Sequence, residues 1–211
     1  MNPRRAPPGL ARIALVAETA PTMASMAARS GTGALAGAAT RVLGVDPGSR
    51  ITGYAIIDTT ADQARYIDAG CVRAGAGAMP DRLAAIFAGL TRVIELHRPE
   101  VMAIEQVFVA RSADSALKLG QARGAAIVAA VNASIPVVEY AARRVKLAVT
   151  GTGAATKEQV AHMVTTLLRL TQTPSADAAD ALAIALCHVN SRASPLRWPG
   201  GGRGKRRWTH L

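Results

Sequence analysis

The sequence predicts an α/β fold in which a mixed sheet, three antiparallel strands followed by parallel strands, is flanked by helices. Two observations support this fold class. Short apolar runs typical of strands alternate with longer segments whose apolar residues recur at helical spacing. Half of the 211 residues are apolar but only 3% are aromatic, so we expect a core of closely packed Ala, Val, Leu and Ile. A chain of this length is expected to form one domain with a substantial core.

A β-hairpin is expected to begin the folded part of the chain. An apolar run over residues 42–46 ends on Asp46, a Pro-Gly pair turns the chain, and a second apolar run over 51–58 returns. A third strand over 64–72 has a less regular pattern, which suits the edge of a sheet. The hairpin therefore holds a carboxylate at the end of the first strand.

The later elements follow from apolar spacing and from residues that stop or start helices. Pro99 ends the first helix, and Thr156 is placed to cap a later one. Three leading strands followed by strands joined through helices is the order of the ribonuclease H-like fold. The expected bounds are helix 80–97, strand 101–105, helix 112–132, strand 136–140, and helices 141–149, 157–170 and 175–191.

The helix expected over 112–132 has small residues along one face, including Gly120 and Gly124. Glycine inside a helix costs about 0.8–1 kcal/mol relative to alanine, so two of them indicate that another backbone approaches closely. Either the sheet beneath the helix or the matching helix of a two-fold partner would explain this face.

The net charge of +11 is concentrated at the two ends of the chain. Residues 1–40 contribute +3 and residues 192–211 contribute +6, so charge alone is weak evidence for a nucleic-acid site. Residues 1–40 lack periodicity, and we expect a disordered extension or a translation start placed too early. Residues 192–211 are expected to form a basic disordered tail, which leaves 41–191 as the folded domain.

The sequence favours a cytoplasmic protein. No apolar run approaches the roughly 18 residues of a membrane span, and the apolar run near the N-terminus is too short for a signal peptide. Cys71 and Cys187 lack the spacing of metal ligands and suit reduced thiols.

Four acidic residues stand where a single cleft can collect them. Asp46 ends the first strand and Glu105 ends the fourth, and these strands are neighbours in a ribonuclease H-like sheet. Asp177 and Asp180 are three residues apart at the start of the last helix, so they share a face. Four carboxylates in one cleft repel one another unless cations neutralise them, and Mg²⁺ is the common choice where phosphate is also bound. Two such ions about 3.5–4 Å apart activate a water and stabilise the leaving oxygen of a phosphodiester.

Each acid also has an ordinary structural explanation. An Asp between a strand and a Pro-Gly turn is often only a turn residue, and an Asp in the first turn of a helix is favoured by the helix dipole. The coincidence of all four at strand ends and one helix start favours a metal site. Neither a His/Cys cluster nor a Gly-x-x-x-x-Gly-Lys-Ser/Thr loop in the sequence competes with it.

Four blocks of the sequence resemble the RuvC family of Holliday-junction resolvases: VDPGSRITGYAIID, AIEQVFVARSADSALKLGQARGAAIVAAVN, EYAARRVK and PSADAADALAIALCH. The resemblance runs from about residue 41 to residue 190 and is specific, because long blocks match in order. It implies a homodimeric, Mg²⁺-dependent endonuclease, with two ions per active site and Mn²⁺ able to substitute, that cuts two opposed strands of a four-way DNA junction symmetrically. It also implies association with the RuvA–RuvB branch-migration motor.

The resemblance further assigns roles to residues. The four catalytic acids of the family match the four acids named above. An aromatic residue that stacks on a base near the crossover matches Phe108, for which a place in the core is the alternative; such stacking is worth roughly 1–3 kcal/mol per base. Basic residues that contact the scissile region match Lys146 and Lys157. Further cations that would contact phosphates, or remain solvated surface charges, are Arg111, Lys118, Arg123, Arg143 and Arg144.

Two other functional classes share part of this pattern. An actin-like ATPase also has Asp and Gly in its first hairpin, but it needs a second Gly-rich phosphate hairpin that this sequence lacks. A junction-binding scaffold without catalysis is favoured only where one of the acids is missing, and all four are present.

Overall fold

The computed structural model describes residues 39–60, 63–106 and 112–193. Phe108 and Arg111, both predicted to contact DNA, lie outside these residues, as do nearly all of residues 1–40 and 194–211. The described elements are β1 (Thr40–Asp46), β2 (Ile51–Thr59), β3 (Ala64–Arg73), α2 (Met79–His97), β4 (Val101–Gln106), α3 (Ala113–Asn132), β5 (Val137–Ala141), α4 (Ala142–Thr150), α5 (Lys157–Leu167) and α6 (Ala176–Ala193). Within the described chain, no helix is long and apolar enough to cross a membrane.

The strands form one mixed sheet in the order β3-β2-β1-β4-β5. β1 pairs antiparallel with β2, and β2 pairs antiparallel with β3, whereas β4 runs parallel to both β1 and β5. The predicted fold class is therefore confirmed, including β3 at the edge and β1 beside β4. Since β1 and β4 are parallel neighbours, the acids at their ends reach the same edge of the sheet.

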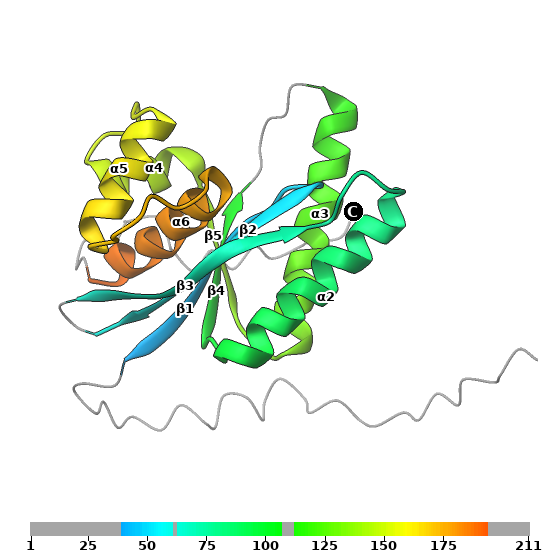
Figure 1. Cartoon of the computed structure of the whole chain (residues 1–211), viewed down its shortest axis with the longest axis horizontal. Coiled ribbons are helices and arrows are strands. Elements are labelled where there is room, and N and C mark those ends of the chain that lie inside the picture. The colour runs from blue at the N-terminus through cyan, green and yellow to red at the C-terminus, as the bar shows by residue number, and fades with distance from the viewer. Residues whose placement is uncertain (1–38, 61–62, 107–111, 194–211) are drawn as a thin grey trace, which may run out of the picture. The chain divides into compact units, whose positions relative to one another are not determined.

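Helices cover both faces of the sheet (Figure 1). On one face, α6 packs across the strands with α4 and α5 outside it, and this layer holds Leu182, Ile184 and Val164 in its core. On the other face, α2 and α3 pack over Leu43, Ile56 and other apolar side chains of the strands. Alternate residues of the central strands thus enter two separate cores, which explains why β1 and β4 are apolar almost throughout.

The turn between β1 and β2 is closed by a buried side chain. The hydroxyl of Thr52, which is fully buried, donates to the carbonyl oxygen of Gly48 at 2.9 Å. This bond satisfies a polar group inside the protein and fixes the return of the chain just after Asp46. The hairpin that the sequence predicts is therefore a defined support for the first acid.

Helix α5 begins as predicted but ends earlier. Thr156 caps it in a full capping box, because its hydroxyl accepts from Gln159 N and the Gln159 side chain accepts from Thr156 N. The helix ends at Leu167, not at residue 170 as expected, because Arg169 adopts a left-handed conformation with φ of 52°. The chain then turns towards α6.

The small-residue face of α3 does not pack on the sheet. Alanines on the opposite side, including Ala122 and Ala126, make the buried contact. A Cβ added at Gly120 or Gly124 would meet nothing within 4 Å. Of the two explanations for these glycines, close packing on the sheet is therefore wrong.

Asp58 anchors the end of the hairpin far from Asp46. Its carboxylate accepts from Arg41 Nε at 2.7 Å and from Arg65 at 3.1 Å, and only 9% of the Asp58 side chain is exposed. The hydrogen bond from Arg41 is the main cause that lowers the pKa of Asp58. This buried carboxylate is therefore ionised and held by two guanidinium groups.

Candidate active site

Asp46 and Glu105 lie side by side at the end of two parallel strands. The pairing of β1 with β4 runs from Val42–Val101 to Val45–Ile104, and these acids are the next residue of each strand. Both side chains are partly buried. The parallel register that the sequence predicts for these strands thus brings the first two acids together.

Two glycines allow the last helix to approach the same place. Gly53 stands opposite Asp46 in the β1–β2 pairing, and a Cβ at Gly53 would collide with the carbonyl oxygen of Asp177. A Cβ at Gly44 would likewise collide with the carbonyl oxygen of Ala181. The α6 backbone therefore lies directly on β1 and β2, and its first turn is carried beside Asp46.

These glycines are functional positions that the sequence reasoning missed. Glycine inside a strand weakens the strand and often marks a close approach of another backbone. Gly44 in Val-Leu-Gly-Val-Asp and Gly53 in Ile-Thr-Gly-Tyr carry this signal. What the sequence did not show is which helix makes the approach.

The charges of the neighbouring acids act on Asp46 and Glu105. The pKa of Asp46 is raised to about 8, first by burial and then by the negative charges of Asp180, Glu105 and Asp177. Burial, followed by the charge of Asp180, also raises the pKa of Glu105. Acids drawn from β1, β4 and α6 thus act on one another electrostatically, as the sequence predicted for a single cleft.

Two of the predicted cations lie beside these acids. Lys157, the first residue of α5, places its Nζ 2.7 Å from Asp180 Oδ2, and this hydrogen bond is the main cause that raises the pKa of Lys157. The positive charges of Lys157 and Lys146 both act to lower the pKa of Glu105. The cluster of acids therefore has a lysine on each of two neighbouring helices.

Among the other predicted cations, Lys118 and Arg143 make contacts away from the acids, and Arg123 contacts two glutamates. Lys118 forms an ion pair with Asp114 one turn earlier on α3. Arg143 lies on α4 against Gly153, where an added Cβ would be 2.7 Å from Arg143 Cγ. Arg123 pairs with a glutamate and is not a free surface charge. Lys118 and Arg143 thus have no contact with the cluster among the described contacts, whereas Arg123 also donates a hydrogen bond to the backbone oxygen of Glu105.

The side chains suit a hard divalent cation. Within residues 39–60, 63–106 and 112–193, no three Asp, Glu, His or Cys side chains are already gathered closely enough to hold a metal ion. The acids nevertheless lie near enough for their charges to raise the pKa of Asp46. A proton on Asp46 and the ammonium of Lys157 compensate part of the negative charge. Mg²⁺ binds to oxygen ligands such as carboxylates. The cluster offers such oxygens, and its remaining negative charge favours a bound cation.

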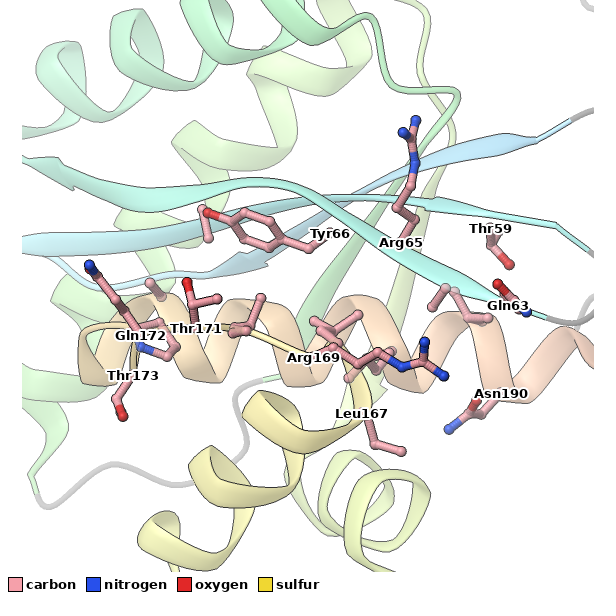
Figure 2. A pocket seen from close by; sticks show the side chains of 18 of the residues that line it. Thr59, Gln63, Arg65, Tyr66, Leu167, Arg169, Thr171, Gln172, Thr173 and Asn190 are labelled. Atoms are coloured by element: carbon pink, nitrogen blue, oxygen red, sulfur yellow. The ribbon is translucent and has the colours of Figure 1, made fainter.

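A groove of about 1270 Å³ is lined in part by Ser175 and Ala178, which lie on both sides of Asp177 in the sequence. Figure 2 shows it between β3, which contributes Tyr66, and the segment after α5, which contributes Arg169; Asn190 of α6 lies at one end. None of the four acids lines this groove. It is therefore not part of the candidate active site.

A sequence model described as "Crossover junction endodeoxyribonuclease RuvC" matches residues 42–188. The chain belongs to the RuvC family. This confirms the resemblance carried by the four sequence blocks, and all four acids lie within the matched residues. Membership of this nuclease family implies dependence on a divalent metal.

Relatives and solved structures agree with this family. The chain is 56% identical over 163 residues to crossover junction endodeoxyribonuclease RuvC of Aeromonas hydrophila subsp. hydrophila, covering 77% of this chain and 94% of the relative. The RuvC of Cronobacter sakazakii is 59% identical over 157 residues, covering 74% and 91%. The structure of T. thermophilus RuvC in complex with a Holliday junction substrate aligns with a TM-score of 0.69 at 36% identity, covering 73% of this chain and 95% of that one. The yeast mitochondrial Holliday junction resolvase Ydc2, at 12% identity and a TM-score of 0.55, shares the fold.

Proposed function

We propose that this RuvC-family chain cuts four-way DNA junctions by Mg²⁺-dependent phosphodiester hydrolysis, with Asp46, Glu105, Asp177 and Asp180 as its catalytic, metal-binding acids. One observation carries the assignment of the site. Burial and three neighbouring carboxylates raise the pKa of Asp46 to about 8. A partly buried carboxylate surrounded by others at a sheet edge is costly for the fold, and a bound cation offsets that cost.

The acids and lysines have distinct tasks in this proposal. The four acids would hold two Mg²⁺ ions, for which Mn²⁺ would substitute, and these ions would supply a site for activating water and for stabilising the leaving oxygen. Cation binding would displace the proton of Asp46 to solvent. The carboxylates of β1, β4 and α6 would then hold the cations. Lys157, now paired with Asp180, and Lys146 are placed to contact the phosphate at the cut. Phosphate contacts position the DNA without reading its sequence.

The remaining DNA contacts are proposed from the family resemblance for Phe108 and from the sequence alone for the basic residues. Phe108 stacks on an unpaired base near the crossover, where stacking contributes roughly 1–3 kcal/mol. Arg111, Lys118 and Arg143 contact phosphates along the arms. Residues 41–191 form the nuclease domain, and the basic segment 192–211 adds salt-dependent, non-specific DNA affinity.

We further propose that two copies associate through the exposed face of α3. Leu117, Val128 and Val131 are 63%, 49% and 59% exposed, respectively, and they lie on the same side as the open glycines Gly120 and Gly124. Small residues between exposed apolar ones allow two helices to approach closely. A two-fold dimer presents two identical sites, which is what symmetric cutting of opposed strands needs. We also propose, as a separate point, that the protein acts in the cytoplasm as a partner of the RuvA–RuvB motor.

A synthetic mobile four-way junction tests this function. Each of the four strands is end-labelled in turn, and the nicks made with Mg²⁺ are mapped. We expect paired nicks at symmetric positions in two opposed strands, which a ligase then seals. A linear duplex of the same sequence and a reaction with EDTA are the controls. Equal cutting of the linear duplex, or no nicks in the junction, would contradict the proposal.

A further inference from the structure

Arg123 joins α3 to β4, which carries the catalytic acid Glu105, and to the neighbouring strand β5. Its Nε donates to the backbone oxygen of Glu105 at 3.2 Å, and its terminal nitrogen lies 2.6 Å from Glu139 Oε1 in β5. Only 21% of the Arg123 side chain is exposed. One guanidinium thus holds the main chain of a catalytic acid and a side chain of the next strand.

Glu105 is paired with a neighbouring strand on one side only. The β1–β4 pairing stops at Ile104, one residue before it, whereas the pairing with β5 continues through Glu105 to Gln106. On the β1 side, the position of Glu105 therefore depends on contacts other than a strand neighbour. The hydrogen bond from Arg123 to the backbone oxygen of Glu105 is a contact of this kind, made by a helix and not by a strand.

The place of Arg123 on its helix suits this task. It follows buried Ala122 and precedes Ala126, which packs in the core, so the segment that carries it is firmly seated. Gly120, three residues earlier, lies on the exposed face of α3. Arg123 therefore stands at the border between the two faces, and its guanidinium is directed to the sheet by both contacts.

We infer that Arg123 is a positioning residue that holds Glu105 in the geometry required for metal binding. The inference rests on the proposed function of Glu105 as a metal ligand. It differs from the sequence-based expectation that Arg123 contacts phosphates, because the guanidinium is already engaged by protein groups. A fork with several donors in fixed directions makes both contacts together, and the single ammonium of a lysine does not.

Mn²⁺ binding to the DNA-free protein, measured by titration calorimetry, tests this inference without relying on cleavage. We expect Arg123→Gln to weaken Mn²⁺ binding roughly 10–100-fold, the range typical for loss of a group that orients a metal ligand. The Mn²⁺ affinity of Arg123→Lys should lie between those of Arg123→Gln and the wild type. Glu139→Ala, which removes only the second contact, should weaken binding in the same direction by a smaller factor. The matched control is Arg92→Gln, which makes the same charge change at an exposed position of α2.

Junction affinity and single-turnover cleavage complete the test. Arg123→Gln should bind the junction as the wild type does, remain in the same oligomeric state, and cleave more slowly at saturating protein. Wild-type Mn²⁺ affinity in Arg123→Gln or in Glu139→Ala would overturn the inference. Loss of junction affinity with unchanged Mn²⁺ affinity would also overturn it, by making Arg123 a DNA contact. If the proposed function itself fails, the wild type does not cut junctions, whereas failure of this inference leaves wild-type cutting intact.

Discussion

Replacing Gly53 with alanine tests how the active site is assembled. A Cβ at this position would lie 3.3 Å from Asp177 Cβ and would collide with the Asp177 carbonyl oxygen. Ordinary non-bonded contacts need about 3.5 Å or more, so the first turn of α6 must shift by an amount on the order of 1 Å. Overpacking of this kind costs about 1–3 kcal/mol of folding free energy. A displacement of about 1 Å in a catalytic group lowers the rate by roughly 100-fold.

Urea unfolding and single-turnover junction cleavage measure the two effects of Gly53→Ala. Gly77→Ala is the matched control, because the nearest atom to its added Cβ is Asp81 Oδ2 at 3.9 Å. We expect the control to keep wild-type stability and cleavage. A Gly53→Ala protein with the stability and the cleavage rate of the control would show that α6 does not rest on β2 beside Asp46, and would refute the reasoning.

Three further predictions concern charge and DNA contact. The pKa of Asp46 is raised from 3.8 to about 8, so between these pH values the folded protein keeps a proton that the unfolded chain has lost. The free energy of unfolding of the metal-free protein should therefore fall between about pH 4 and pH 8 and level off above that. Urea unfolding at a series of pH values should show a smaller fall of this free energy in Asp46→Asn than in the wild type. The same dependence on pH in both proteins would contradict the raised pKa of Asp46. Asp58→Asn should lower the free energy of unfolding by about 1–3 kcal/mol, because it leaves Arg41 and Arg65 without their carboxylate. The control Asp114→Asn, which breaks an exposed ion pair on α3, should lower it by about 0.5 kcal/mol or less. Equal losses would show that the Asp58 pairs contribute no more than a surface pair. Phe108→Ala should bind the junction nearly normally and cleave poorly in the same single-turnover assay, and unchanged cleavage would return Phe108 to the core.

The ends of the elements that carry the acids followed from local sequence patterns, and the strand order followed from the ribonuclease H-like order of elements. Asp46 and Glu105 end short apolar runs next to turn residues, a pattern consistent with buried strands. Asp177 and Asp180 are three residues apart at a helix start, which places them on one face without any tertiary information. These four residues were therefore predictable as a group, and the structure brings their charges together.

Contacts between distant elements were not predictable in the same way. Gly44 and Gly53 signal that some backbone approaches, but only the packing of α6 shows which one. Arg123 reads as a surface cation in the sequence, because its partners Glu105 and Glu139 lie 18 and 16 positions away on strands. The glycines of α3 were ambiguous for the same reason, since a helix pattern does not say which face meets the sheet.

Asp46→Asn tests the central claim most directly, in a measurement of junction binding and strand cutting on the same preparation. Asparagine keeps the size of the side chain and removes the charge that a metal ion requires. We predict near-normal affinity for a four-way junction and no paired nicks with Mg²⁺. Symmetric cutting by Asp46→Asn at the wild-type rate would contradict the assignment of Asp46, and with it the metal site built from β1, β4 and α6.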